Sequence, residues 1–198
     1  MTLLRKYISA ILKESSVIPE EVYKIPVVPY PEEGTREFAQ DLARVIHQKS
    51  NRVVPEDLQG ACDSDMEGLF EDYLSSKGIT YNSSYFEKMV KDLRPIISTL
   101  KDFYNRPRPE AYAKKMGLHF RSDYLKSAQT PAYPSGHTIQ AYVFALLLAD
   151  QFPEEKEGLI GIAEMVSQSR IDRGVHFPSD VDFGRKIARL IVGEMLDK

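Results

Sequence analysis

Hydrophobic residues recur every three or four positions along most of the chain, a spacing that places them on one face of an α-helix. It predicts helices at about residues 38–46, 64–78, 84–104, 139–152, 154–170 and 179–196. The segment between residues 110 and 133 lacks this periodicity and is expected to be a loop with at most one short helix. No convincing strand pattern is present. The sequence therefore predicts an all-α fold, a helical bundle with its functional site between helix ends.

Two serine–glutamate pairs mark expected helix starts. Ser64 with Glu67, and Ser84 with Glu87, have the spacing of a capping box, in which the two side chains satisfy backbone N–H groups of the first turn. Pro95 falls inside the second of these helices and is expected to kink it, because proline cannot donate a backbone hydrogen bond.

The most apolar stretch of the chain is residues 139–152, which include Gln140 and Asp150. A helix needs about 20 residues to cross the hydrocarbon core of a bilayer, so this stretch is too short to span a membrane. It is predicted to be a buried core helix, and no integral membrane segment is expected.

The N-terminal segment, residues 1–13, is amphipathic. We expect it to dock on the core as part of an N-terminal extension, residues 1–34, with contact to a membrane surface as the alternative. It lacks the uninterrupted apolar core and the cleavage site of a secretory signal. The only cysteine is Cys62, which excludes an intramolecular disulfide. These features favour a cytoplasmic protein, with a periplasmic location as the alternative if a leader has been removed.

Length and composition indicate one globular domain. The 198 residues are 42% hydrophobic and 28% charged, which is typical of a single domain covering residues 1–198. The formal net charge is -3, and no basic patch is interleaved with aromatic residues, so no nucleic-acid partner is expected.

Three fixed cations and a glycine-containing turn indicate a site for an anion. Lys101, Arg108 and Arg170 supply a point charge and two planar guanidinium groups that match phosphate oxygens. Ser135 and Gly136 precede the apolar stretch and are expected at the N-terminus of that helix, where free N–H groups and the helix dipole attract an anion. Glycine also allows the backbone to approach a phosphoryl oxygen closely.

Two histidines and one carboxylate accompany these cations. Asp180 follows His176 by four residues, so its carboxylate can accept a hydrogen bond from one imidazole nitrogen and leave the other as a nucleophile. His137 is then available to protonate a leaving group. Each motif alone is also typical of a turn or a surface ion pair, but the three in this order indicate a reaction at phosphorus. His47 and His119 lie outside the motifs and are not expected to be catalytic.

Together the motifs resemble the complete tripartite signature of the type 2 phosphatidic acid phosphatase (PAP2) superfamily. The matching residues are Lys101-x6-Arg108-Pro109, Pro134-Ser135-Gly136-His137 and Ser169-Arg170-x5-His176-x3-Asp180, within residues 101–180. The flanking sequences at 101–109, 132–138 and 175–181 are most similar to the bacterial class A non-specific acid phosphatases.

The resemblance implies a fold and a role for each matched residue. The fold is the single-domain, all-α helical bundle of acid phosphatases and vanadium haloperoxidases. In that family the residue matching His176 becomes phosphorylated, the one matching Asp180 orients it, and the one matching His137 protonates the leaving group. The residues implied to hold the phosphoryl oxygens are Lys101, Arg108, Ser135, Gly136 and Arg170. No metal or other cofactor is implied, the expected partner is a small-molecule phosphate ester, and the dimeric relatives suggest a homodimer.

The function expected from these residues is metal-independent hydrolysis of phosphomonoesters through a phosphohistidine intermediate, with a rate maximum in mildly acidic to neutral conditions. Three alternatives stay open. A vanadium-dependent haloperoxidase would hold vanadate as a cofactor in the same site, a lipid or diphosphate phosphatase would take another substrate, and a silent protein would only bind phosphate. The last is disfavoured because phosphate binding does not require both histidines.

Three charged residues depart from the pattern of the class A enzymes. Glu110 follows the first motif, and Asp172 and Arg173 lie inside the last one. We expect all three near the mouth of the pocket, where they would alter substrate preference and not the reaction.

Overall fold

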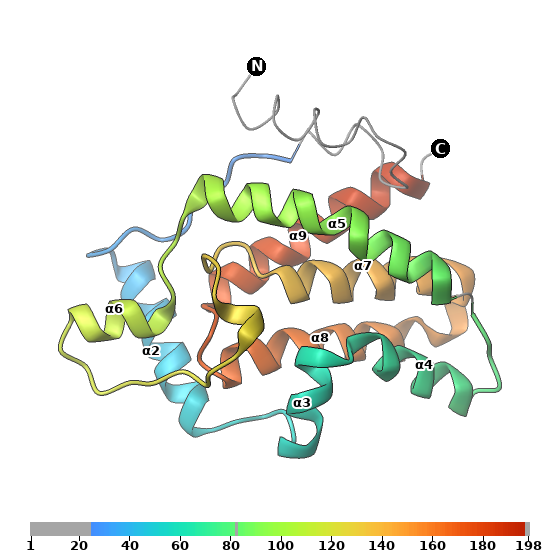
Figure 1. Cartoon of the computed structure of the whole chain (residues 1–198), viewed down its shortest axis with the longest axis horizontal. Helices are drawn as coiled ribbons and strands as arrows, with labels where there is room; N and C mark the ends of the chain where they lie inside the picture. The colour runs from blue at the N-terminus through green and yellow to red at the C-terminus, as the bar shows by residue number, and fades with distance from the viewer. Residues whose placement is uncertain (1–24, 82, 197–198) are drawn as a thin grey trace.

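The computed structural model describes residues 25–81 and 83–196 (Figure 1). The α-helices in these ranges are α2 (Arg36–Ser50), α3 (Glu56–Ser64), α4 (Met66–Ser76), α5 (Ser83–Tyr104), α6 (Pro109–Lys115), α7 (Gly136–Gln151), α8 (Lys156–Asp172) and α9 (Pro178–Leu196). Short 3-10 helices lie at Lys126–Ala128 and Pro153–Glu155. Since the described residues contain no strand, the prediction of an all-α fold is confirmed.

α7 forms the centre of the bundle. It packs most extensively against α8 and α9 and also contacts α5, and Figure 1 shows it between α5 and α8. Every residue from Ala141 to Ala145 is buried, as expected for a helix that is covered on all sides. The prediction of a buried core helix at residues 139–152 is thus confirmed. Within the described ranges, no helix has the length and apolar character needed to cross a membrane.

A smaller apolar cluster fixes the segment between α8 and α9. The ring centroids of Phe38 in α2 and Tyr112 in α6 lie 4.9 Å apart. Phe177, just before α9, lies 6.2 Å from Phe38 and 6.0 Å from Tyr112. Val181 is fully buried in the same cluster. This packing holds in place the backbone that carries His176.

The corner between α3 and α4 differs from the sequence prediction. The sequence predicts one helix that starts at Ser64, but α3 ends at this residue and α4 begins after it. Asp65 is the cap of α4, and its side chain accepts a hydrogen bond from the Gly68 N–H at 3.2 Å. α3 carries no clear apolar periodicity, because its fully buried residues are Gln59 and Cys62 and one of them is polar.

The predicted loop between residues 110 and 133 contains most of α6 and one 3-10 helix. α6 begins at Pro109. Proline has no backbone N–H, but the first N–H groups of a helix have no partner within the helix, so no hydrogen bond is lost at this position. Glu110 in α6 accepts hydrogen bonds from the backbone N–H and the hydroxyl of Ser122 at 3.1 and 2.6 Å. Its carboxylate therefore anchors the loop that follows α6.

The N-terminal extension predicted at residues 1–34 is described from residue 25 onward, and the amphipathic segment 1–13 lies outside the described residues. Ile25 is buried in the main hydrophobic core. The ring of Tyr30 lies 5.5 Å from that of Tyr133, in an edge-to-face arrangement.

Asp172 and Arg173 fasten α3 to the end of α8. The buried Asp172 carboxylate accepts hydrogen bonds from the backbone N–H groups of Val53 and Val54 at 2.9 and 2.8 Å. Arg173 donates to the Gln59 carbonyl oxygen at 2.9 Å. The expectation that both residues lie at the pocket mouth is therefore wrong. Asp172 is turned toward the connection between α2 and α3 because the backbone N–H groups there need an acceptor.

We expect Asp172→Ala to lower the free energy of unfolding by about 2–3 kcal/mol, since it leaves two N–H groups without their acceptor. Urea denaturation followed by circular dichroism measures the change. The matched control is Asp150→Ala, which removes an exposed aspartate at the end of α7 and should change the value by less than about 0.5 kcal/mol. Equal effects of the two substitutions would contradict the anchoring role.

Candidate active site

The N-terminus of α7 forms one wall of the site. Ser135 is the cap of this helix, and its hydroxyl oxygen accepts hydrogen bonds from the N–H and the hydroxyl of Thr138 at 3.4 and 2.9 Å. Gly136 follows as the first helical residue, where free N–H groups and the helix dipole favour an anion. A Cβ atom at this position would lie 3.1 Å from a methyl group of Ile97, so there is little room for a side chain.

His176 is oriented by the first turn of α9. Its Nδ1 atom lies 3.1 Å from Oδ2 of Asp180, which also accepts the Phe177 N–H at 2.8 Å. A carboxylate beside Nδ1 favours the tautomer with its proton there, which leaves the lone pair on Nε2. Nε2 lies 2.9 Å from a guanidinium nitrogen of Arg108. Burial, followed by the charges of Arg108 and Lys101, holds the pKa of His176 well below its usual range, so the imidazole is neutral.

A buried arginine that the motif analysis did not select holds the other oxygen of Asp180. Arg106 is fully buried and donates to Oδ1 of Asp180 at 2.5 Å and to Asp41 of α2 at 3.0 Å. Its guanidinium carbon also lies 3.8 Å from the ring centroid of Phe177. Burial raises the pKa of Asp180, and the positive charge of Arg106 opposes that effect.

Asp41 carried a signal in the sequence. It lies three residues after Phe38 and four before Val45, on the apolar face of α2, where an unpaired carboxylate would be unfavourable. A charged residue in such a position requires a buried partner, and Arg106 supplies it.

Lys101, Arg108 and Arg170 are crowded together by the fold. Lys101 donates to the Pro131 carbonyl oxygen, and Arg108 donates to the carbonyl oxygens of Thr130 and Val175 at 2.8 and 2.6 Å. Burial, followed by the charge of Arg108, lowers the pKa of Lys101 to about 7. Burial likewise lowers the pKa of Arg108 to about 10. An anion that binds between these groups would relieve their repulsion and favour their charged forms.

Asp63 of α3 reaches the site from the opposite side and contacts both Arg170 and His137. Its Oδ1 atom accepts from Arg170 at 2.7 Å and from the Ser127 hydroxyl at 2.5 Å. Burial alone would raise the pKa of Asp63, but these two hydrogen bonds and the charge of Arg170 bring it below the usual value.

Nε2 of His137 lies 3.0 Å from the Asp63 carbonyl oxygen and 3.5 Å from its carboxylate. A carbonyl oxygen only accepts, so Nε2 carries a proton and Nδ1 is left for the cavity. Burial, followed by the charge of Arg170, lowers the pKa of His137 to about 3.

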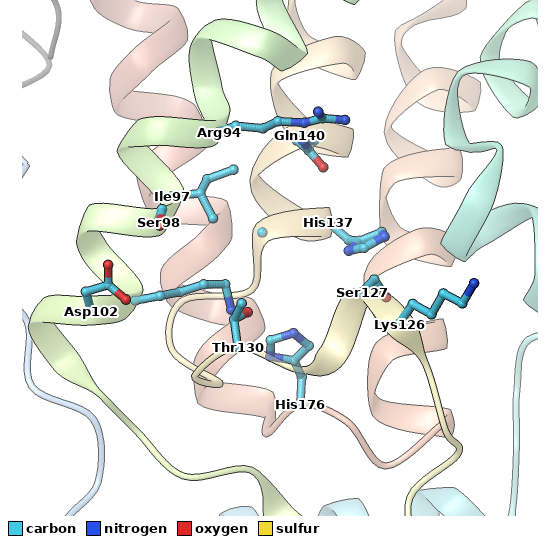
Figure 2. A pocket seen from close by; sticks show the side chains of 12 residues that line it. Arg94, Ile97, Ser98, Asp102, Lys126, Ser127, Thr130, His137, Gln140 and His176 are labelled. Atoms are coloured by element: carbon cyan, nitrogen blue, oxygen red, sulfur yellow. The ribbon is translucent and has the colours of Figure 1, made fainter.

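A cavity of about 390 Å³ opens between α5, α7 and the 3-10 helix at Lys126–Ala128. Figure 2 shows His137 and His176 at this cavity, the first on α7 and the second on the segment before α9. Lys101 and Gly136 also line it. The volume suits a small organic phosphate.

The fold brings together the residues that the sequence predicted for this site. Four of them line the cavity directly, and Ser135 and Asp180 are buried behind them. Arg108 reaches His176, and Arg170 reaches His137 through Asp63. His47 lies at the end of α2 beside Asn51, and His119 lines a different cavity.

Glu110 is near the site but on its outer side. It lines a separate cavity of about 510 Å³ that Arg108 also borders. The expectation that it lies at the mouth of the catalytic pocket is therefore replaced by a position in this neighbouring cavity, where it anchors Ser122.

Asp63 had no local signal in the sequence. It lies in a helix without apolar periodicity and is separated from His137 by 74 residues and from Arg170 by 107. Only the packing of α3 against α8, to which Asp172 and Arg173 contribute, brings it to the site.

The chain is similar to several bacterial phosphatases. A non-specific acid phosphatase of Providencia stuartii is 27% identical over 169 residues, which cover 81% of this chain and 68% of that protein. One of Salmonella typhimurium is 32% identical over 90 residues, or 46% of this chain and 36% of that protein. An acid phosphatase of Zymomonas mobilis is 24% identical over 129 residues, or 62% and 48%. The aligned stretches thus span about two thirds of the first relative and less than half of the other two.

The sequence profile of the PAP2 superfamily matches residues 92–196. This range covers more than half of the chain and contains all three motifs, from Lys101 to Asp180. The chain therefore belongs to the PAP2 superfamily and is homologous to the bacterial non-specific acid phosphatases.

Proposed function

We propose that this protein is a phosphatase that hydrolyses phosphate monoesters through a phosphohistidine intermediate on His176. Its similarity to proteins described as acid phosphatases supports the hydrolysis of phosphate esters. One observation carries the mechanism. His176 is held by Asp180 at Nδ1, and its Nε2 lies 2.9 Å from Arg108, so the nucleophilic nitrogen and a phosphate-binding cation meet at one point.

In the first step, Lys101, Arg108 and Arg170 bind the phosphoryl oxygens together with N–H groups at the start of α7. Nε2 of His176 attacks phosphorus, a P–N bond forms, and the bond from phosphorus to the ester oxygen breaks. His137 gives its proton to that oxygen, so the alcohol leaves neutral. The side-chain cations stabilise the phosphoryl charge in the way that Mg²⁺ does in kinases. No metal is needed for this step.

In the second step, water attacks the phosphorus of phosphohistidine. His137, now neutral, takes a proton from the water while the P–N bond breaks and its electron pair returns to Nε2. Inorganic phosphate leaves, and His137 is again protonated. The same imidazole thus acts first as acid and then as base.

Asp63 supports the acid form of His137. Its carbonyl oxygen fixes the proton on Nε2 and its carboxylate, 3.5 Å away, favours the doubly protonated ring. Burial and the charge of Arg170 lower the pKa of His137 to about 3. A bound phosphoryl group adds negative charge and raises this pKa, so His137 takes up its proton together with the substrate.

Vanadate is expected to inhibit, because its oxygens would be held by the residues that hold phosphate. The vanadium haloperoxidase alternative would use the same ion as a cofactor and would oxidise bromide with peroxide. The relatives reported above are described as acid phosphatases, which favours the phosphatase.

We expect His176→Ala to lower kcat at least about a thousandfold, since it removes the nucleophile. Hydrolysis of p-nitrophenyl phosphate with EDTA present measures the loss, and radiolabelled phosphoenzyme should be trapped only with the intact histidine. His47→Ala removes a histidine outside the site and is the matched control. Unchanged activity in His176→Ala would show that the nucleophile is another group.

The pH dependence should reflect Lys101. Its pKa of about 7 means that the lysine is charged below pH 7 and neutral above it in the free enzyme. Since kcat/KM reports the free enzyme, the loss of the lysine charge should make it fall as pH rises through about 7. Lys101→Arg keeps the positive charge and should move this alkaline limb upward by at least about one pH unit. A kcat/KM that climbs steadily to about pH 9 would contradict the assignment.

Asp63→Asn tests the support of His137. The variant keeps the backbone carbonyl and the size of the side chain but loses the charge. We expect kcat to fall by about tenfold and its alkaline limb to move to lower pH, because the protonated form of His137 is less favoured. Asp57→Asn, an exposed position in α3, is the control. A loss of kcat with an unmoved pH profile would leave Asp63 with only a structural role.

A further inference from the structure

The catalytic cavity continues past His137, away from the phosphate-binding cations. Arg94 of α5 and Gln140 of α7 line this part of it. Figure 2 shows Arg94 extending from α5 toward α7, on the side of His137 that faces away from His176. Because His137 protonates the departing oxygen in the proposed reaction, this end of the cavity receives the leaving group.

A second cavity of about 480 Å³ lies next to this end, beside the α3–α4 corner. Arg94, Ser127, His137 and Gln140 border both spaces. A leaving group larger than the phosphoryl group therefore has room to extend toward the second cavity, where Arg94 and Gln140 lie beside it.

Arg94 and Lys101 lie on one face of α5. They are seven residues apart, which is two helical turns and about 10 Å along the axis. Lys101 thus belongs to the phosphate-binding cluster, and Arg94 lies on the leaving-group side. The apolar Ile97 and the exposed Ser98 line the cavity wall between them. Two cations at this separation suit a molecule with two anionic groups.

Arg94 is exposed, and its side chain forms no hydrogen bond or ion pair with residues 25–81 and 83–196. The carboxylates that face the two cavities have other positions or partners. Three of these carboxylates lie at the α3–α4 corner. Asp63 pairs with Arg170, and Asp65 caps α4. Glu67 accepts a hydrogen bond from the Tyr81 hydroxyl at 3.5 Å. Asp102 lies beside Lys101 at the other end of α5. The guanidinium of Arg94 is therefore available to an incoming group.

We propose that Arg94 and Gln140 form a second anion-binding subsite, and that the preferred substrates are organic phosphates whose leaving group carries another anionic group, a phosphate or a carboxylate. This rests on the proposed function, which identifies the leaving-group side of the cavity. The planar guanidinium binds two oxygens of such an anion, and the Gln140 amide can donate to one of these or, in a phosphate, to a third oxygen.

The test compares two substrates that differ by one charge, phenyl phosphate and 4-carboxyphenyl phosphate, in wild type and Arg94→Gln. The wild type should prefer the carboxylated ester in kcat/KM. In Arg94→Gln this preference should fall at least about tenfold, while kcat/KM for phenyl phosphate changes less than about threefold. Arg94→Lys keeps the positive charge but loses the planar guanidinium that binds two oxygens at once, so it should retain part of the preference.

Lys91→Gln is the matched control. It removes one positive charge from an exposed position of α5, three residues from Arg94, that does not line either cavity. A general effect of net charge would change the preference equally in Lys91→Gln and Arg94→Gln, and that result would overturn the subsite.

Inorganic diphosphate and butane-1,4-diol bisphosphate distinguish the kind of second anion. If Arg94→Gln reduces kcat/KM for either of them more than for 4-carboxyphenyl phosphate, the subsite selects phosphate, and the opposite order indicates a carboxylate. An unchanged preference in Arg94→Gln, with phenyl phosphate still hydrolysed, would refute the subsite alone. If the wild type hydrolyses none of these esters, the proposed function itself fails.

Discussion

The buried ion pair between Arg106 and Asp180 is the interaction on which the site depends. It joins the segment before α6 to the first turn of α9, and through Asp41 it also joins α2. Charges removed from water are costly, and each partner would be strongly destabilising without the other. The pair therefore fixes Asp180 in one orientation. That carboxylate in turn fixes the tautomer and the ring orientation of His176. The placement of the candidate nucleophile is therefore set by residues that do not line the cavity.

The rest of the site concentrates positive charge where burial disfavours it. Lys101, Arg108 and Arg170 have lowered pKa values, and burial is the first cause in each. The apolar packing of α7 against α8 and α9 supplies the stability that tolerates this crowding. A phosphoryl group bound among them would remove the repulsion. In the proposed reaction this fixed arrangement of cations supplies the preorganisation that electrostatic catalysis requires.

α3 connects the end of α8 to the candidate active site. Asp172 and Arg173, which interrupt the last motif with charges, hold the start of α3 and the segment before it, and the end of α3 delivers Asp63 to Arg170 and His137. Their position inside the last motif predicts that Asp172 and Arg173 lie at the pocket mouth, but neighbours in a motif need not be neighbours in the pocket. A helix turns its residues through 100° at each step, so adjacent positions face different surroundings. Asp172 consequently faces the backbone of residues 53 and 54, away from the cavity.

The sequence by itself determined the all-α class and the central helix, because helical periodicity is local. It also selected eight residues that the fold gathers at one site, because motif spacing is local and the proposed phosphate chemistry restricts which side chains can serve. It also carried an unused signal for Asp41, a charge on an apolar helix face. Only the tertiary structure decided the partners that lie far away in the chain, Arg106 for Asp41 and Asp63 for His137, and it alone placed Arg94 at the cavity beside His137. These contacts join helices that local patterns describe one at a time, and the packing of side chains between helices sets which residues meet.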